Sequence, residues 1–538
     1  MNYIPTYAPY RSVRYPVYAG HGMVCASSAQ ASAAGLEILR RGGNAMDAAV
    51  ATAAALTVTE PTANGIGGDA FALVWVEGDK RLYGLNASGV SPKSLTLDAA
   101  RARCPDGKMP TYGWLPTMVP GAPGGWAALS RRFGRLSMTE TLKPAVSYAQ
   151  DGYPAGANLA RMWKRALTKY QAACTAPEFR AWYDTFAPGG RAPEAGERIR
   201  LPGHAKALQA IAETDAKAFY EGEIADAIVA ESDTFGGFYR KEDFSTYAPE
   251  WVEPISVNYR GCDVWEIPPN GQGITALMAL NILKEFPFPE KESVSTYHTQ
   301  WEAMKIAFAD AMHHVTDPRA MRIDYHDLIR PAYGALRAKE IGPTAGSPGP
   351  MDPPRSGTVY FCTADGEGNM VSFIQSNYMG FGSGIVIPGW GVSLQNRGHD
   401  FSLDETAANV LAPGKKCYHT IIPGFLTKDG EALGPFGVMG GYMQPQGHVQ
   451  VVMNLLDFAL GPQQALDAPR WQWIQGNTFQ VEDTFPNEIA KQLAARGHTV
   501  EVALDNVAFG RGQIILRGGH GTLVGGTESR TDSNIACY

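Results

Sequence analysis

Thr358 directly follows a stretch that cannot form regular secondary structure. Residues 342–357 contain five prolines and four glycines in sixteen positions. Because proline fixes φ and removes an N–H donor, this segment is expected to be an exposed, mobile linker. A threonine behind such a linker can attack the carbonyl carbon before it, and Gly357 leaves room for that attack. Cleavage would then free an α-amine with a pKa near ~8, which can serve as general base for the same hydroxyl.

The linker therefore predicts self-cleavage between Gly357 and Thr358, with Thr358 as an N-terminal nucleophile. On the pattern alone, an ordinary linker followed by an ordinary hairpin is the commoner explanation. The segments that follow predict such a hairpin, since residues 358–364 and 370–378 favour strands and 365–369 favours a turn. With the turn centred on Glu367, Thr358 lies opposite Ser376 and their hydroxyls come within reach. A slip of one residue would separate them.

Other segments must form the frame that positions this hairpin. The Ala-rich run after Gly42-Gly-Asn44 predicts two closely packed helices, and a glycine turn at 64–69 precedes a buried strand. The expected elements are helices over 29–41, 45–57, 296–313 and 449–460 and a strand over 70–75. His298 and the pair His313-His314 lie at the ends of the third helix. Without an HExxH motif they are expected to be structural, and no metal site is predicted.

Composition sets the class of protein. The 538 residues are 45% hydrophobic and 18% charged, which is typical of a folded chain. A net charge of −7 without long basic runs argues against nucleic acid or an anionic membrane as a partner. Seven cysteines without a CxxC spacing argue against a disulfide framework and favour a reducing, cytoplasmic location. We find neither a secretory signal nor an apolar run of membrane-spanning length.

Ordered motifs from about residue 20 to the C-terminus resemble the gamma-glutamyltransferase family of N-terminal-nucleophile hydrolases. The matching stretches are Gly42–Ala49, Gly65–Gly68, Val119–Gly121, Pro268–Gly273, Glu302–Asp310, Asp317-Pro318, Phe381–Gly384, Asp400–Ser402 and Ala468–Arg470. The resemblance implies an α+β fold, namely an αββα four-layer sandwich. It also implies one precursor that cuts itself into a large subunit, residues 1–357, and a small subunit, residues 358–538. No cofactor is implied, and a homodimer stays open.

The resemblance also implies catalytic roles. Thr358 falls on the family nucleophile, and Ser376 falls on a second threonine that hydrogen-bonds it. Gly440 and Gly441 fall on a Gly-Gly pair whose N–H groups form the oxyanion hole. Without the family, a plain turn would be the favoured interpretation of these two glycines.

The substrate pocket departs from the family pattern. Family transpeptidases hold the glutamyl α-carboxylate with an arginine, and Ser88 stands at that position here. Their pair of serines before a proline is replaced by His419 and Thr420. The Asn, Gln and Asp that surround the α-amino group become Tyr378, Arg397 and Asp400. A cation thus stands where an ammonium group would bind, and repelled or unsatisfied charge in a dry pocket costs on the order of ~2–5 kcal/mol.

These departures predict a different substrate. Residues 371–376, 382–384, 395–398 and 401–404 look closer to oxamate amidohydrolase and to the glutathione hydrolase-like branch. We therefore expect an amidohydrolase for a small acidic acyl group, with Arg397 on the carboxylate. A surface or interface salt bridge is the alternative role for Arg397. The alternatives for the whole protein are a true gamma-glutamyl peptidase or transferase with a rearranged pocket, and an inactive binding relative that stays uncleaved.

Overall fold

Two antiparallel sheets stacked face to face form the centre of the protein. The computed structural model describes residues 13–347 and 357–538. One sheet has the strand order β1 (Val17–Ala19), β20 (Leu523–Thr527), β19 (Arg511–Arg517), β15 (Glu431–Met439), β14 (Gly424–Lys428), β9 (Cys262–Glu266), β8 (Ile255–Tyr259). The other has the order β21 (Asn534–Cys537), β2 (Met23–Ala26), β10 (Gly357–Ala364), β11 (Met370–Tyr378), β3 (Asp69–Val76), β4 (Arg81–Ala87), β7 (Glu250–Val252).

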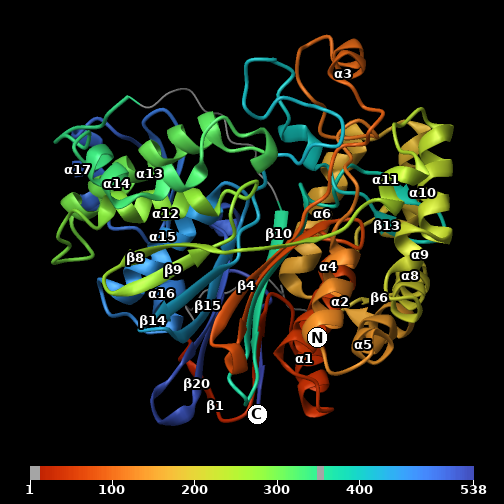
Figure 1. The fold of residues 1–538 in the computed structure, drawn as a ribbon, viewed down its shortest axis with the longest axis horizontal. Helices are drawn as coiled ribbons and strands as arrows, with labels where there is room; N and C mark the ends of the chain where they lie inside the picture. The colour runs from red at the N-terminus through yellow and green to blue at the C-terminus, as the bar shows by residue number, and fades with distance from the viewer. Residues whose placement is uncertain (1–12, 348–356) are drawn as a thin grey trace.

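Helices cover the outer face of each sheet, so the molecule has four layers (Figure 1). The β10 sheet carries α1 (Ala29–Arg40), α2 (Ala45–Thr59) and α4 (Ala122–Phe133), with α5 (Met138–Asp151) and α8 (Pro202–Glu213) outside them. The β15 sheet carries α12 (Gly273–Leu283), α15 (Met443–Leu456) and α16 (Pro462–Asp467), with α13 (Val294–His314), α14 (Pro331–Ala338) and α17 (Asn487–Ala495) beyond. The expected α+β, αββα sandwich is confirmed.

Shorter elements complete the two lobes. The remaining helices are α3 (Leu97–Arg103), α6 (Ala157–Ala173), α7 (Arg180–Phe186), α9 (Lys217–Tyr220), α10 (Glu223–Thr234) and α11 (Lys241–Ser245). The remaining strands are β5 (Tyr153–Pro154), β6 (Arg198–Ile199), β12 (Val386–Ile387), β13 (Val392–Ser393), β16 (Trp471–Gln475), β17 (Thr478–Glu482) and β18 (Thr499–Ala503). Within the described ranges, no helix is both long enough and apolar enough to span a bilayer.

The break between α1 and α2 is encoded locally. Gly42 has a φ of 94°, a left-handed conformation that ends α1 at little cost. The Asn44 side chain then accepts the N–H groups of Met46 and Asp47, and the Asp47 carboxylate accepts the N–H of Asn44. This capping box starts α2, whose residues are all buried. The expected helices at 29–41 and 45–57 and the strand at 70–75 therefore match α1, α2 and β3 closely.

The helix expected at 449–460 is displaced. Helix α15 runs from Met443 to Leu456, because buried glutamines in its first turns make internal bonds that a hydrophobicity pattern does not reveal. Gln446, for example, donates to Trp473 O and accepts the N–H of the same residue. The helix ends early because Ala459 adopts a left-handed φ of 52°. Helix α13, in contrast, covers the expected 296–313 with one to two residues added at each end.

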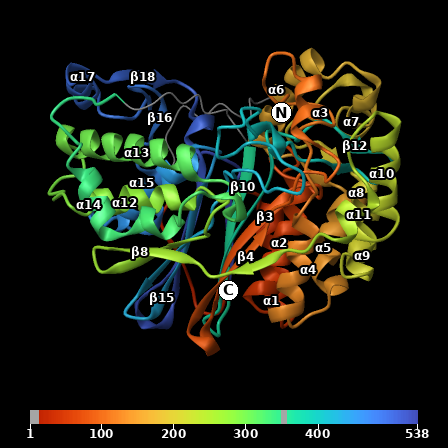
Figure 2. The same cartoon turned by 45° about the horizontal axis from the view of Figure 1, so that its top comes forward.

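The hairpin register is the predicted one. Val359 pairs with Gln375, and the ladder continues without a shift to the pair Ala364–Met370. A bulge separates Val359 from Gly357, which pairs with Tyr378. Strand β10 lies between β2 and β11, in the interior of its sheet. Figure 2 shows β10 passing through the centre of the molecule. Of the linker expected at 342–357, residues 348–356 lie outside the described part, and Gly357 already belongs to β10.

Close packing between the sheets depends on a small residue opposite β10. A Cβ at Gly437 would lie 2.6 Å from Cζ of Tyr360, two residues after Thr358, and the buried ring has no space to retreat into. We expect Gly437→Ala to lower the stability by about 1–3 kcal/mol through overpacking. Thermal unfolding of the purified protein measures this. Gly78→Ala is the control, since its Cβ would meet nothing within 4 Å, and equal melting temperatures for both variants would contradict the expectation.

Candidate functional site

Thr358 and Ser376 form the centre of the site. Both side chains are buried, and their hydroxyl oxygens lie 3.1 Å apart. The Ser376 hydroxyl also accepts the N–H of Tyr378 at 2.8 Å, which fixes its position. Alternation along β10 puts Thr358 on the same face as Tyr360, which contacts Gly437 of the opposite sheet. The Thr358 hydroxyl therefore points between the two sheets.

The glycine pair follows directly after β15. Gly440 and Gly441 have φ values of 139° and 62°, which non-glycine residues rarely adopt. Among the described residues, neither N–H donates to a turn or loop carbonyl. The pair can therefore present two unused donors. Gln272, which sequence reasoning did not single out, supports this loop, because its side-chain amide donates to Gly441 O at 2.8 Å and to Thr420 O at 2.6 Å.

Four of the expected pocket residues come together around one guanidinium group. Arg397 donates to the Thr420 hydroxyl at 2.8 Å and lies 3.9 Å from the centroid of the Tyr378 ring. The nearest carboxylate oxygen of Asp400 is 3.7 Å from Arg397 Nη1. Tyr378 donates its hydroxyl to the other oxygen of Asp400 at 2.5 Å. Burial raises the pKa of Asp400, while Arg397 and the Tyr378 hydroxyl act in the opposite direction.

This cluster has unused hydrogen-bonding capacity. Arg397 Nε and Nη2 and Asp400 Oδ2 are buried and have no hydrogen-bond partner in the described part of the protein. Buried donors without partners are costly, so a ligand that accepts from the guanidinium would be bound favourably. Arg397 itself is 1% exposed, which excludes the surface salt bridge considered for it.

Ser88 and His419 instead have partners within the protein. The Ser88 hydroxyl donates to Asn86 Oδ1 at 2.7 Å and lies in a buried amide cluster with Asn270. His419 contacts Asp69 through Nε2 and the N–H of Ile421 through Nδ1. Burial lowers the pKa of His419 well below its usual value, so the ring is neutral. No described hydrogen bond joins either residue to Arg397, and their part in substrate binding stays a prediction.

A cavity of about 420 Å³ lies beside the cluster. Its walls include Asp400, Tyr418 and Tyr442, the last of which follows the glycine pair. Met312 and Val315 make part of the wall apolar, while His313 and Arg322 add polar groups. The cavity has room for a small ligand and reaches the cluster through Asp400, while Thr358, Ser376 and Arg397 are not part of its wall.

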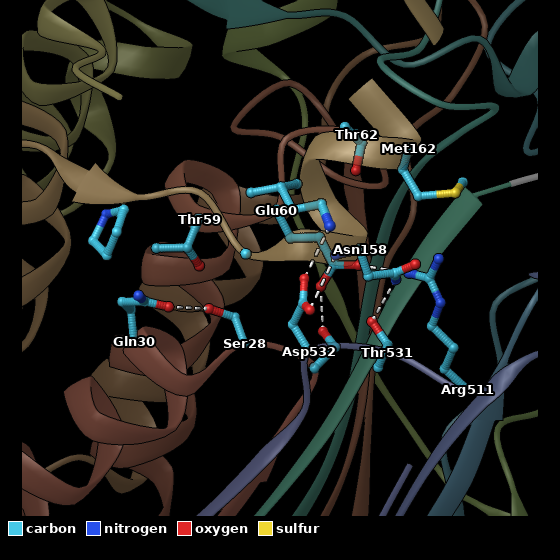
Figure 3. A pocket seen from close by; sticks show the side chains of 14 residues that line it. Ser28, Gln30, Thr59, Glu60, Thr62, Asn158, Met162, Arg511, Thr531 and Asp532 are labelled. Carbon is cyan, nitrogen blue, oxygen red and sulfur yellow. Dashed lines mark hydrogen bonds and ion pairs between the residues drawn. The ribbon is translucent and has the colours of Figure 1, made fainter. Parts of the chain in front are cut away.

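A smaller polar hollow of about 30 Å³ lies between α2, α6 and the C-terminal segment (Figure 3). Glu60 accepts from Arg511 there at 2.8 Å, and Asp532 accepts the N–H groups of Asn158 and Leu159. Burial raises the pKa of Glu60 to about 7. The hollow has room for little more than a water molecule, which is too small for a substrate. Its hydrogen bonds instead connect segments that are far apart in the sequence.

Three possible metal ligands, His298, Glu302 and His498, also converge under the start of the linker. The ammonium group of Lys305 lies 2.6 Å from the Glu302 carboxylate. His298 donates from Nε2 to Gly342 O at 2.9 Å, so its Nδ1 accepts from His498 at the same distance. Glu302 also accepts the N–H of Gly346. Glu302 Oε1 and His498 Nδ1 have no hydrogen-bond partner in the described part of the protein, but the contacts to Gly342 and Gly346 anchor the first residues of the linker.

Comparison with known proteins defines the family. A family profile described as Gamma-glutamyltranspeptidase matches residues 31–538, and the chain belongs to this family of self-processing N-terminal-nucleophile hydrolases. It is 38% identical over 526 residues to the glutathione hydrolase-like YwrD proenzyme of Bacillus subtilis (strain 168), covering 95% of this chain and 97% of the relative.

Two further relatives carry different activities in their names. The oxamate amidohydrolase proenzyme of Klebsiella pneumoniae is 32% identical over 536 residues, covering 96% of this chain and 98% of that protein. The crystal structure of a cephalosporin acylase from Bacillus halodurans is similar with a TM-score of 0.97 and 56% identity, covering 100% of this chain and 99% of that one. The protein is thus an enzyme, and the names of its relatives specify different activities.

The Thr358–Ser376 contact makes a testable prediction. Ser376→Ala removes the hydrogen bond to the Thr358 hydroxyl, and we expect amide hydrolysis to slow about 10- to 1000-fold. Steady-state rates on an anilide substrate measure the effect. Ser372→Ala is the matched control, since Ser372 lies on the same strand and bonds Tyr360 instead, at 2.8 Å. Similar rates for wild type and Ser376→Ala would show that this hydroxyl has no part in the reaction.

Proposed function

We propose that the precursor cuts itself between Gly357 and Thr358 and that Thr358 then hydrolyses an amide whose acyl group carries a carboxylate. The Thr358–Ser376 hydroxyl pair, buried at the start of a central strand, is the observation that carries this proposal. In the mature enzyme the Thr358 α-amine takes the proton of the Thr358 hydroxyl as the oxygen attacks the amide carbon. The N–H groups of Gly440 and Gly441 donate to the oxyanion that forms.

The later steps use the same groups. The protonated α-amine gives its proton to the leaving amine, and the C–N bond breaks to leave an ester on Thr358. The amine then accepts a proton from a water molecule that attacks the ester. It returns this proton to the Thr358 oxygen as the C–O bond breaks, which releases the acid and restores the hydroxyl. The nucleophile and the base belong to one residue, and no step draws on a cofactor or a metal.

The charge around Arg397 supports an acidic acyl group. Asp400 already faces a cation and a phenol hydroxyl, so it is poorly suited to hold an α-ammonium group. The free edge of Arg397 can donate two parallel hydrogen bonds to a carboxylate. An oxamate-like amide satisfies this chemistry. The cavity beside Asp400 also has room for longer chains such as a glutaryl group.

Two features of the whole chain belong to the same proposal. The large subunit comprises residues 1–357 and the small subunit residues 358–538, and both remain in one sandwich. All seven cysteines are free thiols, which supports a reducing, cytoplasmic location. A homodimer stays a prediction.

Processing is tested on the purified protein. We expect two bands on a denaturing gel and a new N-terminus at Thr358. Thr358→Ala should abolish cleavage and turnover and leave the fold intact, because the attacking oxygen is lost. Thr358→Ser should retain part of both, since a hydroxyl and an α-amine remain. N-terminal sequencing and circular dichroism provide the measurements.

A single intact band from wild type would favour the alternative of an uncleaved relative. A new N-terminus at another residue would remove Thr358 as the nucleophile.

Specificity is tested at Arg397. We expect Arg397→Gln to lower kcat/KM for oxamate or a glutaryl amide by about 2 kcal/mol, roughly 30-fold, through loss of one charge-assisted contact. An uncharged amide of the same length, hydrolysed by the same variant, is the control and should change little.

Glutathione decides between the main alternatives. If glutathione is the best substrate of the wild type, and Arg397→Gln keeps that order and rate, the gamma-glutamyl alternative replaces the acidic-amide proposal.

A further inference from the structure

Asp69 is a buried carboxylate that the chemistry above does not use. It is the first residue of β3 and pairs with Ser376 of β11, the strand that lies between β3 and the strand of Thr358. It is 1% exposed. Its Oδ1 accepts the N–H groups of Gly89 at 3.0 Å and Gly121 at 3.1 Å. These two bonds fasten the carboxylate to the large-subunit backbone.

The first connection from Asp69 to Arg397 passes through Gln395. The Gln395 amide nitrogen donates to Asp69 Oδ2 at 3.0 Å. Because a carboxylate accepts only, Asp69 determines which end of the amide faces it. The amide oxygen is thereby turned toward Arg397, whose backbone N–H it accepts at 2.6 Å. The orientation of one amide thus fixes the main chain at Arg397.

The second connection passes through His419. The N–H of Ile421 donates to Nδ1 of the ring at 3.3 Å, so the proton of the neutral imidazole lies on Nε2. That N–H donates to Asp69 Oδ2 at 3.1 Å. Thr420 lies between the two anchored positions, and its hydroxyl accepts from Arg397 Nη1 at 2.8 Å. The first connection therefore reaches the main chain of Arg397, and the second reaches its guanidinium group through Thr420.

We propose that Asp69 is the positioning residue that holds Arg397 and Thr420 against the acyl group of the substrate. Asp69 acts through Gln395 and His419 and touches no reacting atom. The inference rests on the proposed function, since it assigns Arg397 to the acyl carboxylate. This role of Asp69 explains why His419 is buried and why both of its ring nitrogens form hydrogen bonds.

The charge of Asp69 makes the connections sensitive to pH. Burial raises the pKa of Asp69 to about 7, against the lowering effects of Arg397, the two backbone N–H groups and Lys416. The facing ring of His419 is neutral, and burial raises the pKa values of Tyr220, Tyr239 and Tyr247 nearby, so they keep their protons. Below a pH of about 7, Asp69 gains a proton and loses acceptor capacity for Gln395 and His419.

The test compares glutaryl-p-nitroanilide with pentanoyl-p-nitroanilide, which has the same chain length without the carboxylate. The ratio of their kcat/KM values cancels the titration of the nucleophile and reports on Arg397 alone. We expect the wild-type ratio to fall as the pH falls below about 7. Asp69→Asn should lower the ratio about 10- to 100-fold at pH 8 and abolish its pH dependence, while the precursor still cuts itself.

The matched control is Asp47→Asn. Asp47 is also fully buried and accepts the backbone N–H groups of Asn44 and Arg135, but it belongs to the start of α2. This variant should lose stability and keep the wild-type ratio at every pH.

The possible results distinguish failure of the inference about Asp69 from failure of the proposed function. The inference about Asp69 is wrong if the wild type prefers the glutaryl substrate and the Asp69→Asn variant keeps both the ratio and its pH dependence. The proposed function would stand in that case. A wild type without that preference removes the proposed function and the inference with it. If Asp69→Asn does not fold, Gln395→Leu cuts one connection without removing the charge, and an unchanged ratio in that variant overturns the inference.

Discussion

The pairing of β10 in the middle of its sheet is the constraint on which the rest of the structure depends. One neighbour, β2, lies far before the proposed cleavage point, and the other, β11, lies after it. Strand β11 in turn pairs with β3. Strands from both sides of Gly357 are therefore paired with one another in one sheet, and a cut after Gly357 leaves the ladder from Val359 to Ala364 in place. The same position buries the Thr358 side chain, because a central strand is covered on both faces.

The pocket carries an unusual set of buried charges. Arg397 is the cation of the cluster, and its charge acts to lower the pKa values of Asp69 and Asp400, against the effect of burial. A buried cation is tolerated only when it has compensating charge and hydrogen bonds. Here the compensation is incomplete, since two guanidinium nitrogens have no described partner. An acyl carboxylate would supply the missing acceptors, whereas an α-ammonium group would add a second cation. This charge balance is therefore the physical basis of the proposed preference for an acidic acyl group over an α-ammonium group.

The sequence predicted those features that local rules determine. The hairpin register followed from the centre of a five-residue turn, and the break before α2 followed from Gly42 and the cap at Asn44. The start of α15 could not be predicted, because its buried glutamines bond to Trp471 and Trp473, more than twenty residues away. The proposed role of Asp69 could not be predicted from the sequence either, because it also depends on hydrogen bonds to residues far away in the chain. Its glycine-rich surroundings indicated only a turn, and two of its four donors lie more than 300 residues further along the chain.

With the proposed cut after Gly357, recognition of the substrate would be divided between the two subunits. Thr358, Ser376, Arg397 and Thr420 all belong to residues 358–538, so the small subunit contains the proposed chemistry. Asp69, Gly89 and Gly121 belong to the large subunit, which fixes where those groups stand. Neither subunit alone would form the pocket, because the carboxylate that orients Gln395 and His419 comes from the other one. Strand pairing joins β3 to β11 in the uncut chain, so under the proposed mechanism the pocket is assembled in the precursor and processing would only have to free the α-amine of Thr358.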